Sequence, residues 1–115
     1  TLLLASSLAF AKSFTVTSKD FKDGATLSNK HVFNGMGCNG ENLSPQISWQ
    51  NPPAGTKSFA VTVYDPDAPT GSGWWHWTLF NLPANTKELP QGLTSTRLPK
   101  GAMEGRTDFA KTGFG

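Results

Sequence analysis

Residues 64–77, with the sequence YDPDAPTGSGWWHW, hold most of the side chains in this chain that could do chemistry. They include two carboxylates, Asp65 and Asp67, and His76, which is one of the chain's two histidines. Three of its four tryptophans also fall here, within four positions of one another. Tryptophan is large and usually well buried, so three of them beside a histidine and a carboxylate are typical of a pocket wall.

The spacing of these residues suggests an anion site. Asp65 stands where an apolar strand ends, because Pro66 forbids its regular continuation, and Asp67 would share its side of an extended backbone. If the strands on either side of the stretch are neighbours in a sheet, Asp65 and His76 lie together at the opening of one pocket. A carboxylate beside an imidazole favours the imidazolium form, which suits the anionic oxygen of a phosphate, phosphonate or carboxylate. The tryptophans would add apolar walls and a face for an ammonium group.

A purely structural explanation of the same residues stays open. Asp-Pro-Asp is a common turn composition, and His76 could be a core histidine with its hydrogen bonds satisfied. No Gly-x-Ser-x-Gly elbow surrounds Ser44 or Ser72, and no further ligand pattern completes a metal site at Asp65 and Asp67. We therefore expect no metal, no cofactor and no enzyme activity, although acid–base chemistry by Asp65 and His76 stays conceivable without positive support.

Composition bounds the class of protein. The 115 residues fit one domain, and a net charge of +2 with 16% charged residues gives no strong field and no nucleic-acid surface. The 12 glycines and 8 prolines favour a turn-rich fold. No segment longer than about ten residues has a helical period, so short strands between turns predict a mainly β, antiparallel sandwich with few short helices.

The hydrophobic pattern places the strands that must position the site. We expect strands at 14–17, within 26–33, and at 43–49, 58–64 and 76–82. Strand 58–64 is apolar or small on both faces and should be central in its sheet. Strand 76–82 should direct His76 and Leu82 to one face and Trp77 and Leu79 to the other. Residues 84–100 should form a loop with one helical turn.

The N-terminus resembles a targeting sequence. Residues 1–11 are apolar and uncharged and end in Ala9-Phe10-Ala11, the small-x-small pattern of a signal-peptide cleavage site, which would follow Ala11. The segment is shorter than the roughly 20 residues needed to span a bilayer. We interpret residues 1–11 as a signal-peptide remnant and residues 12–115 as the domain, so the protein should be periplasmic or secreted. A buried first strand or helix is the alternative.

Cys38 is the only cysteine. In an exported chain it is a free thiol or half of a disulfide, whereas in a cytosolic chain it would be an ordinary buried residue. Its glycine-rich surroundings at 34–42 argue against burial.

Two motifs resemble the phosphatidylethanolamine-binding protein family, and more narrowly its bacterial YbhB/YbcL, or Raf-kinase-inhibitor-like, branch. They are DPDAP at 65–69 and GWWHW at 73–77. The resemblance covers residues 14–115, and the further matching segments are 41–45, Trp49, 53–59, 81–84 and 105–109.

The resemblance implies a Greek-key β-sandwich with a small peripheral pocket that binds anions. It also implies a cis bond before Pro69. The resemblance does not by itself assign Trp75 and Trp77 to the pocket, because these side chains could face the core. The expected ligand-binding residues are Asp65, Asp67, Pro69, Trp74 and His76.

Family members continue past Gly-Phe-Gly with a proline-rich loop and a His-Arg-Tyr-type strand. The resemblance therefore implies that this chain is truncated at its C-terminus and that Cys38 pairs with a cysteine beyond Gly115. Because residues 1–11 lack an initiator Met and a basic n-region, we expect truncation at the N-terminus as well. We expect an exported binding protein for a phosphate or phospholipid head group. The alternative is an interaction protein that inhibits a protease, a kinase or a host protein, and a small-substrate hydrolase ranks third.

Overall fold

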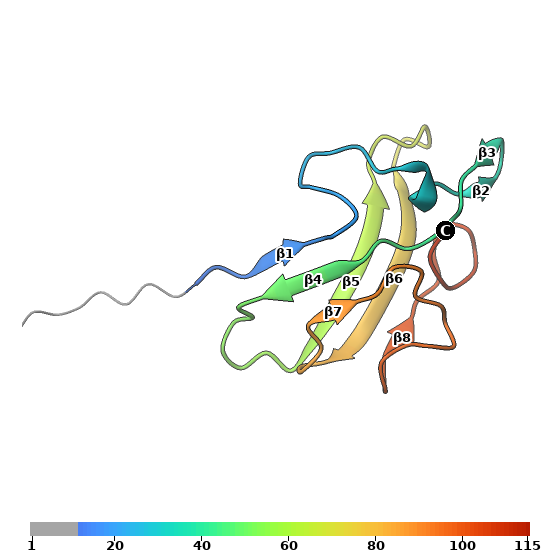
Figure 1. Ribbon diagram of the computed structural model, residues 1–115. Helices are drawn as coiled ribbons and strands as arrows, with labels where there is room; N and C mark the ends of the chain where they lie inside the picture. Colours follow the sequence, from blue (N-terminus) through green and yellow to red (C-terminus); the bar gives the residue numbers. More distant parts are fainter. Residues whose placement is uncertain (1–11) are drawn as a thin grey trace, which may run out of the picture.

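Figure 1 shows the computed structural model, which describes residues 12–115. The expected signal-peptide remnant, residues 1–11, lies outside these residues. No helix within 12–115 is long and apolar enough to cross a membrane. The elements in chain order are β1 (Thr15–Thr17), the 3₁₀ helix η1 (Asn29–His31), β2 (Asn34–Gly35), β3 (Cys38–Asn39), β4 (Ile47–Gln50), β5 (Ser58–Asp65), β6 (Trp74–Pro83), β7 (Glu88–Leu89) and β8 (Met103–Glu104).

The strands form two facing antiparallel sheets and one small hairpin (Figure 1). One sheet has the order β1-β4-β7, the other has the order β5-β6-β8, and β2 pairs with β3. The chain passes from the first sheet to the second after β4 and returns after β6. The expected fold class, a mainly β antiparallel sandwich, is therefore confirmed.

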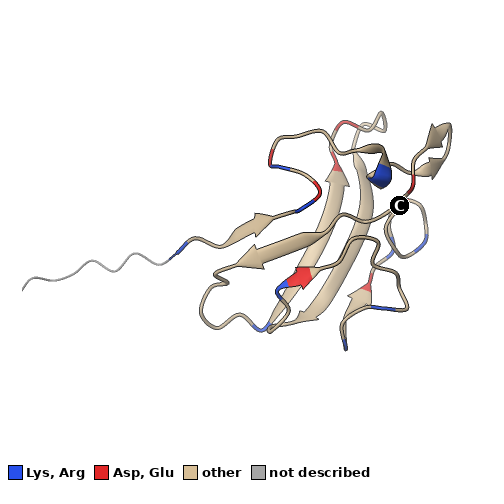
Figure 2. Cartoon of the chain, in the orientation of Figure 1, with Lys and Arg blue, Asp and Glu red and all other residues tan. Residues whose placement is uncertain are grey.

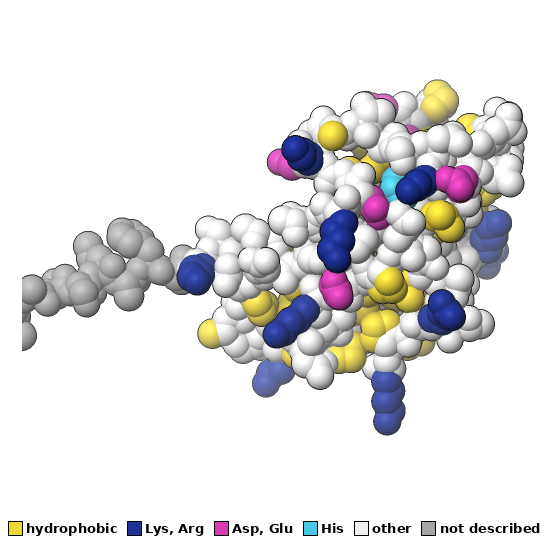
Figure 3. Space-filling view, viewed as in Figure 1, with side chains coloured by type: hydrophobic (Ala, Val, Ile, Leu, Met, Phe, Trp, Pro, Cys, Tyr) yellow, Lys and Arg dark blue, Asp and Glu magenta, His cyan; other side chains and the backbone are white. Residues whose placement is uncertain are grey.

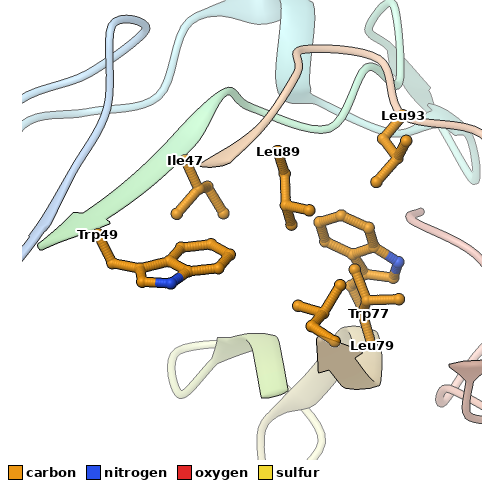
Figure 4. Packing of buried hydrophobic residues seen from close by; sticks show 7 residues of the cluster. Ile47, Trp49, Trp77, Leu79, Leu89 and Leu93 are labelled. Atoms are coloured by element: carbon orange, nitrogen blue, oxygen red, sulfur yellow. The ribbon is translucent and has the colours of Figure 1, made fainter. Parts of the chain in front are cut away.

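The core lies between the two sheets (Figure 4). Ile47, Trp49 and Leu89 point inward from the first sheet, and Trp77 and Leu79 meet them from β6. Leu79 and Leu89 have no exposed surface. At about 25 cal/mol per Å² of apolar area removed from water, this shared core is the main force that holds the layers together.

β5 and β6 form the long hairpin that carries the site. Phe59, Val61 and Val63 alternate toward the core, as a half-buried strand requires. Within the described residues β5 pairs only with β6, so it lies at an edge of its sheet and the expected central position is wrong. Ala60 and Thr62, on its other face, are small enough to remain exposed.

Two register shifts interrupt the pairing of β5 with β6. Phe59 pairs with Leu82 and Val61 pairs with Leu79, so β6 has one extra residue there, and Asn81 takes a positive φ of 58°. This bulge turns Leu82 to the core beside Leu79. The prediction that Leu82 shares the face of His76 is therefore wrong, because strict alternation ignores bulges.

Three other expectations differ from the structure. Residues 29–31 form a 3₁₀ turn rather than a strand, since the His31 amide donates to the Ser28 carbonyl at 3.0 Å. The strand expected at 43–49 begins only at Ile47. The helical turn expected within 84–100 is replaced by β7, whose Leu89 is buried opposite Ile47.

Charged side chains lie mainly outside the long hairpin. Figure 2 shows β5 and β6 almost free of charge except at the end of β5. On the face in Figure 3 acidic and basic groups are interspersed, with no large region of one sign. Asp65 is therefore the one Asp, Glu, Lys or Arg side chain on the two strands of the hairpin.

Candidate functional site

The end of the β5–β6 hairpin brings the two halves of the central stretch together. Asp65 is the last residue of β5 and pairs directly with Trp74, the first residue of β6. Residues 66–73 form the connecting loop. The Tyr64 hydroxyl donates to the Ser72 carbonyl at 2.8 Å and so ties the end of this loop back to β5.

Gly73 is required where the loop enters β6. It is buried and its φ is +74°, a conformation that L side chains rarely adopt. A Cβ atom at this position would lie 2.3 Å from the Tyr64 hydroxyl oxygen and 2.7 Å from the Asp65 carbonyl oxygen. The missing side chain therefore allows Tyr64, the loop and Asp65 to approach one another.

Asp65 shapes the start of the loop. Its side chain is half-buried, and its Oδ1 accepts a hydrogen bond from the Asp67 amide at 2.9 Å. An aspartate that binds the amide two residues on forms an Asx-turn, as the turn interpretation of the sequence expected. The same carboxylate still has lone pairs for a ligand. Asp67 and Pro69 are exposed on the loop.

The peptide bond before Pro69 is not cis, because the described residues contain no cis peptide bond. That expectation from the family resemblance is wrong. The Thr70 amide donates to the Ala68 carbonyl at 2.7 Å, which closes a three-residue turn around Pro69. The fixed φ of proline suits the centre of an inverse γ-turn, so the loop reverses direction with a trans bond.

The backbone of Gly115, rather than the side chain of Asp65, orients His76. The Nδ1 atom bonds the Gly115 carbonyl oxygen, and the Gly115 amide donates to the His76 carbonyl at 3.1 Å. A carbonyl oxygen only accepts, so Nδ1 carries the hydrogen and Nε2 is left for a ligand. The partner that we expected for His76, Asp65, bonds the Asp67 amide instead.

Phe109 joins the site residues into one aromatic cluster. Its ring centroid lies 5.2 Å from Trp74 in an edge-to-face arrangement, 5.7 Å from His76 and 4.5 Å from Phe33. Sequence reasoning placed Phe109 only in a segment that matches the family, not in the site. No local pattern joins positions 33, 74 and 109, so only the fold could find it.

The three neighbouring tryptophans have three different environments. Trp77 is 1% exposed and belongs to the core, whereas Trp75 is 43% exposed and stacks on Tyr64 at 4.5 Å between ring centroids. The Trp75 amide donates to Oδ2 of Asp108 at 2.7 Å. Only Trp74 contacts the cluster around Phe109, so a wall of three tryptophans does not form.

The candidate site lies apart from the cavity between the sheets. A cavity of about 580 Å³ lies elsewhere, between β1, residues 21–27 and β5, and its lining does not include His76. Within 12–115 no three His, Cys, Asp or Glu side chains are arranged to hold a metal ion. Of the expected ligand-binding residues, Trp74 and His76 both lie beside Phe109, and Asp65 pairs with Trp74. Asp67 and Pro69 are exposed on the connecting loop.

Cys38 is exposed on β3, as its glycine-rich surroundings indicated. It has no disulfide partner among residues 12–115. A disulfide with a cysteine outside these residues stays a prediction.

Comparisons with known proteins are consistent along the whole domain. A sequence model described as "Phosphatidylethanolamine-binding protein" matches residues 17–115. The UPF0098 protein YbhB of Escherichia coli is 60% identical over 99 residues, which are 84% of this chain and 63% of YbhB. YbcL of the same organism is 53% identical over an alignment that covers all of this chain and 68% of YbcL. The chain thus spans less than two thirds of the length of YbhB.

Solved structures show the same similarity. The crystal structure of E. coli YbcL, described as a new member of the mammalian PEBP family, has a TM-score of 0.85 at 57% identity. It covers 89% of this chain and 64% of the YbcL chain. A phosphatidylethanolamine-binding protein homolog from Chlamydia trachomatis has a TM-score of 0.74 at 26% identity, over 89% of this chain and 63% of its own.

Proposed function

Since this chain belongs to the phosphatidylethanolamine-binding protein family, we propose that it binds a small anion, such as a phosphate or phospholipid head group, at the end of the β5–β6 hairpin. One observation carries the proposal. Gly115 holds His76 through Nδ1, which leaves Nε2 to donate to an anionic oxygen when the ring is protonated.

The neighbouring residues have separate roles in this proposal. Asp65 takes the cationic part of a zwitterionic ligand, because its half-buried carboxylate lies directly opposite Trp74. Trp74 and Phe109 form the apolar wall beside the His76 ring. Asp67 and Pro69 form the exposed rim over which a ligand enters.

The test is a phosphorus-31 NMR titration of phosphoethanolamine into the purified protein and its His76→Asn variant. Asparagine can still donate to the Gly115 carbonyl but has no group at the position of Nε2. We expect saturable binding that weakens at least about tenfold in the variant, because a hydrogen bond to a charged group is lost. Equal affinity of both proteins would contradict the proposal. The unfolding midpoint of the variant should stay near that of the native protein.

The same titration has a pH dependence of known sign. Histidine is the side chain that ordinarily changes charge between about pH 5 and pH 8, and only its cationic form attracts a phosphate. Relative to His76→Asn, in which the second ionisation of the phosphate acts without the histidine, binding to the native protein should therefore weaken when the pH is raised from about 6 to about 8. The spectra also report turnover, because a hydrolase would release inorganic phosphate, and we propose that none appears.

An interaction protein is the second candidate, favoured by the exposed Tyr64–Trp75 pair beside the loop. Exposed aromatic side chains are enriched at protein interfaces. Inhibition of proteases or kinases by the protein, lost in Trp75→Ala with phosphoethanolamine binding intact, would support this candidate. Equal inhibition by both forms would exclude Trp75 from such an interface.

We further propose that the protein is exported, on the pattern of residues 1–11 alone. Cell fractionation with detection of the processed N-terminus tests this. Recovery of an unprocessed chain from the cytoplasm would contradict it.

A further inference from the structure

The second histidine, His31, is buried with one ring nitrogen unpartnered. Its side chain is 6% exposed, and Nδ1 donates to the Leu43 carbonyl at 2.8 Å, because that oxygen can only accept. Among the described residues Nε2 has no hydrogen-bond partner, and it is shielded from solvent. A neutral ring tolerates this arrangement, whereas a protonated ring would place a charged donor where no acceptor lies.

The charges around His31 do not supply that acceptor. Asp20, on the segment after β1, is near enough for the charge of His31 to lower its pKa, but its oxygens bond Gln46 and Gln91 instead. Lys30, on the same turn as His31, carries a positive charge, which is opposite to the charge of Asp20. On the facing segment 40–43, Glu41 is exposed. Asp20 thus attracts a charged ring without bonding it, and Lys30 repels it.

His31 holds two segments of the chain together. Backbone hydrogen bonds join residues 29–33 to residues 40–43, from the amides of Gly40, Glu41, Asn42 and Leu43 at 2.8–3.1 Å. The ring bond to Leu43 is the side-chain contribution to the same ladder. The β2–β3 hairpin continues this ladder, and Gly40 is buried while Asn42 and Leu43 are half-buried. Opening of the ladder would therefore expose amides that are otherwise protected from exchange.

This ladder reaches the candidate site. Phe33, at its end, packs on Phe109 at 4.5 Å between ring centroids, and Asn42 donates to the Phe114 carbonyl at 3.4 Å. Phe109 and Gly115 are the groups that contact His76. A change in the ladder therefore acts on the residues that hold the ligand-binding ring.

We propose that protonation of His31 opens the segment 29–43 and so makes the ligand site sensitive to acid. The effect on the segment stands on the geometry of His31 alone. The effect on ligand affinity rests on the proposed function. The two histidines should change ligand affinity in opposite directions on acidification. Protonation of His76 strengthens the binding of an anion, whereas protonation of His31 weakens it by loosening the contacts of Phe109 and Gly115 with His76.

Amide hydrogen exchange tests the proposal. Protection factors of Gly40, Asn42 and Leu43 are compared at about pH 7 and about pH 5, where Asp20 stays ionised because its pKa lies below 3.8. We expect protection to fall about tenfold on acidification in the native protein but not in His31→Asn, whose amide can donate to Leu43 without titrating. His76→Asn, which removes the other histidine, is the matched control and should keep the fall.

An equal fall in the native protein and His31→Asn, or no fall in the native protein, overturns the proposal. If His31→Asn does not fold, NMR of the native protein decides. The amide shifts of Gly40 and Asn42 must then titrate with the same midpoint as the His31 ring signals, and a different midpoint overturns the proposal.

Phosphoethanolamine affinity at about pH 5 gives the ligand part of the test. His31→Asn should bind more tightly than the native protein at this pH and equally at about pH 7. Equal affinities at both values contradict coupling to the site. An absence of binding in every variant would count against the proposed function and leave the exchange result standing.

Discussion

At the scale of the residue, the candidate site depends on a glycine, Gly73, and on the fixed orientation of the His76 ring. Gly73 has no Cβ atom, so Tyr64 and Asp65 can approach the backbone of the loop closely. Gly115 bonds Nδ1 of His76 and so fixes the tautomer of the ring. The proposed binding of an anion therefore depends on a ring nitrogen that the backbone of Gly115 has oriented, with Asp65 available for other contacts.

Gly73→Ala should destabilise the protein by about 2–4 kcal/mol, the sum of a strained positive φ and an overpacked contact. Gly71→Ala is the matched control, because its φ is +81° but its Cβ would meet nothing within 4 Å. It should lose only about 1 kcal/mol. Urea unfolding of both variants measures the difference, and equal losses would mean that the contact with Tyr64 is unimportant.

At the scale of the element, Asp20 ties β1 and β4 to the loop after β7. Its Oδ2 accepts from the Gln46 amide at 2.7 Å and its Oδ1 from the Gln91 side chain at 2.8 Å. The Gln46 side chain in turn accepts from the Lys19 amide at 2.8 Å. These bonds hold in place the segment from which β4 enters the core.

The Asp20 contacts predict a pH dependence of stability. The hydrogen bond from the Gln46 amide lowers the pKa of Asp20 from its ordinary value of 3.8. A lowered pKa in the folded state gives stability that is fully present above about pH 3.8 and is lost as the pH falls through the folded value. Asp20→Asn should therefore be less stable than the native protein at pH 7, with the difference shrinking in acid.

Thermal unfolding from about pH 7 down to about pH 3 checks this prediction. Asp23→Asn, at an exposed acidic position three residues away, is the control and should unfold like the native protein throughout. A stability difference for Asp20→Asn that persists undiminished at the lowest pH would contradict the assignment to the ionised carboxylate.

At the scale of the whole molecule, two sheets share one small core, so the residues at its centre carry much of the stability. Leu79 and Phe80 are neighbours on β6 but differ in burial. Leu79 is fully buried, whereas Phe80 is 37% exposed on the outer face of the sheet. The two positions therefore measure how far the stability depends on the interface between the sheets.

Leu79→Ala should cost about 2–5 kcal/mol, the range for a buried leucine that leaves a cavity. Phe80→Ala removes a larger side chain but should cost only about 1 kcal/mol, since much of it already contacts water. Denaturant unfolding of the two variants checks the order. A larger loss for Phe80→Ala would show that its outer face is covered in solution.

The sequence by itself determined the two long strands of the hairpin and the family. Alternating apolar residues at 58–64 and 76–82 predicted β5 and β6, because a side-chain period of two is local information. The motifs at 65–69 and 73–77 predicted the family, which the comparisons show. They also named Asp65, Trp74 and His76 as ligand-binding residues, which stays a prediction, and the structure pairs Asp65 with Trp74 at the end of the hairpin.

Only the tertiary structure decided how those residues are held. The bulge at Asn81 moved Leu82 into the core, and Gly115 rather than Asp65 took the Nδ1 atom of His76. Phe33 and Phe109 meet across 76 positions of chain, and no local pattern reports such a contact. Local propensity specifies strands, but which side chains share a site depends on the packing of distant segments, where burial and hydrogen-bond satisfaction outweigh sequence proximity.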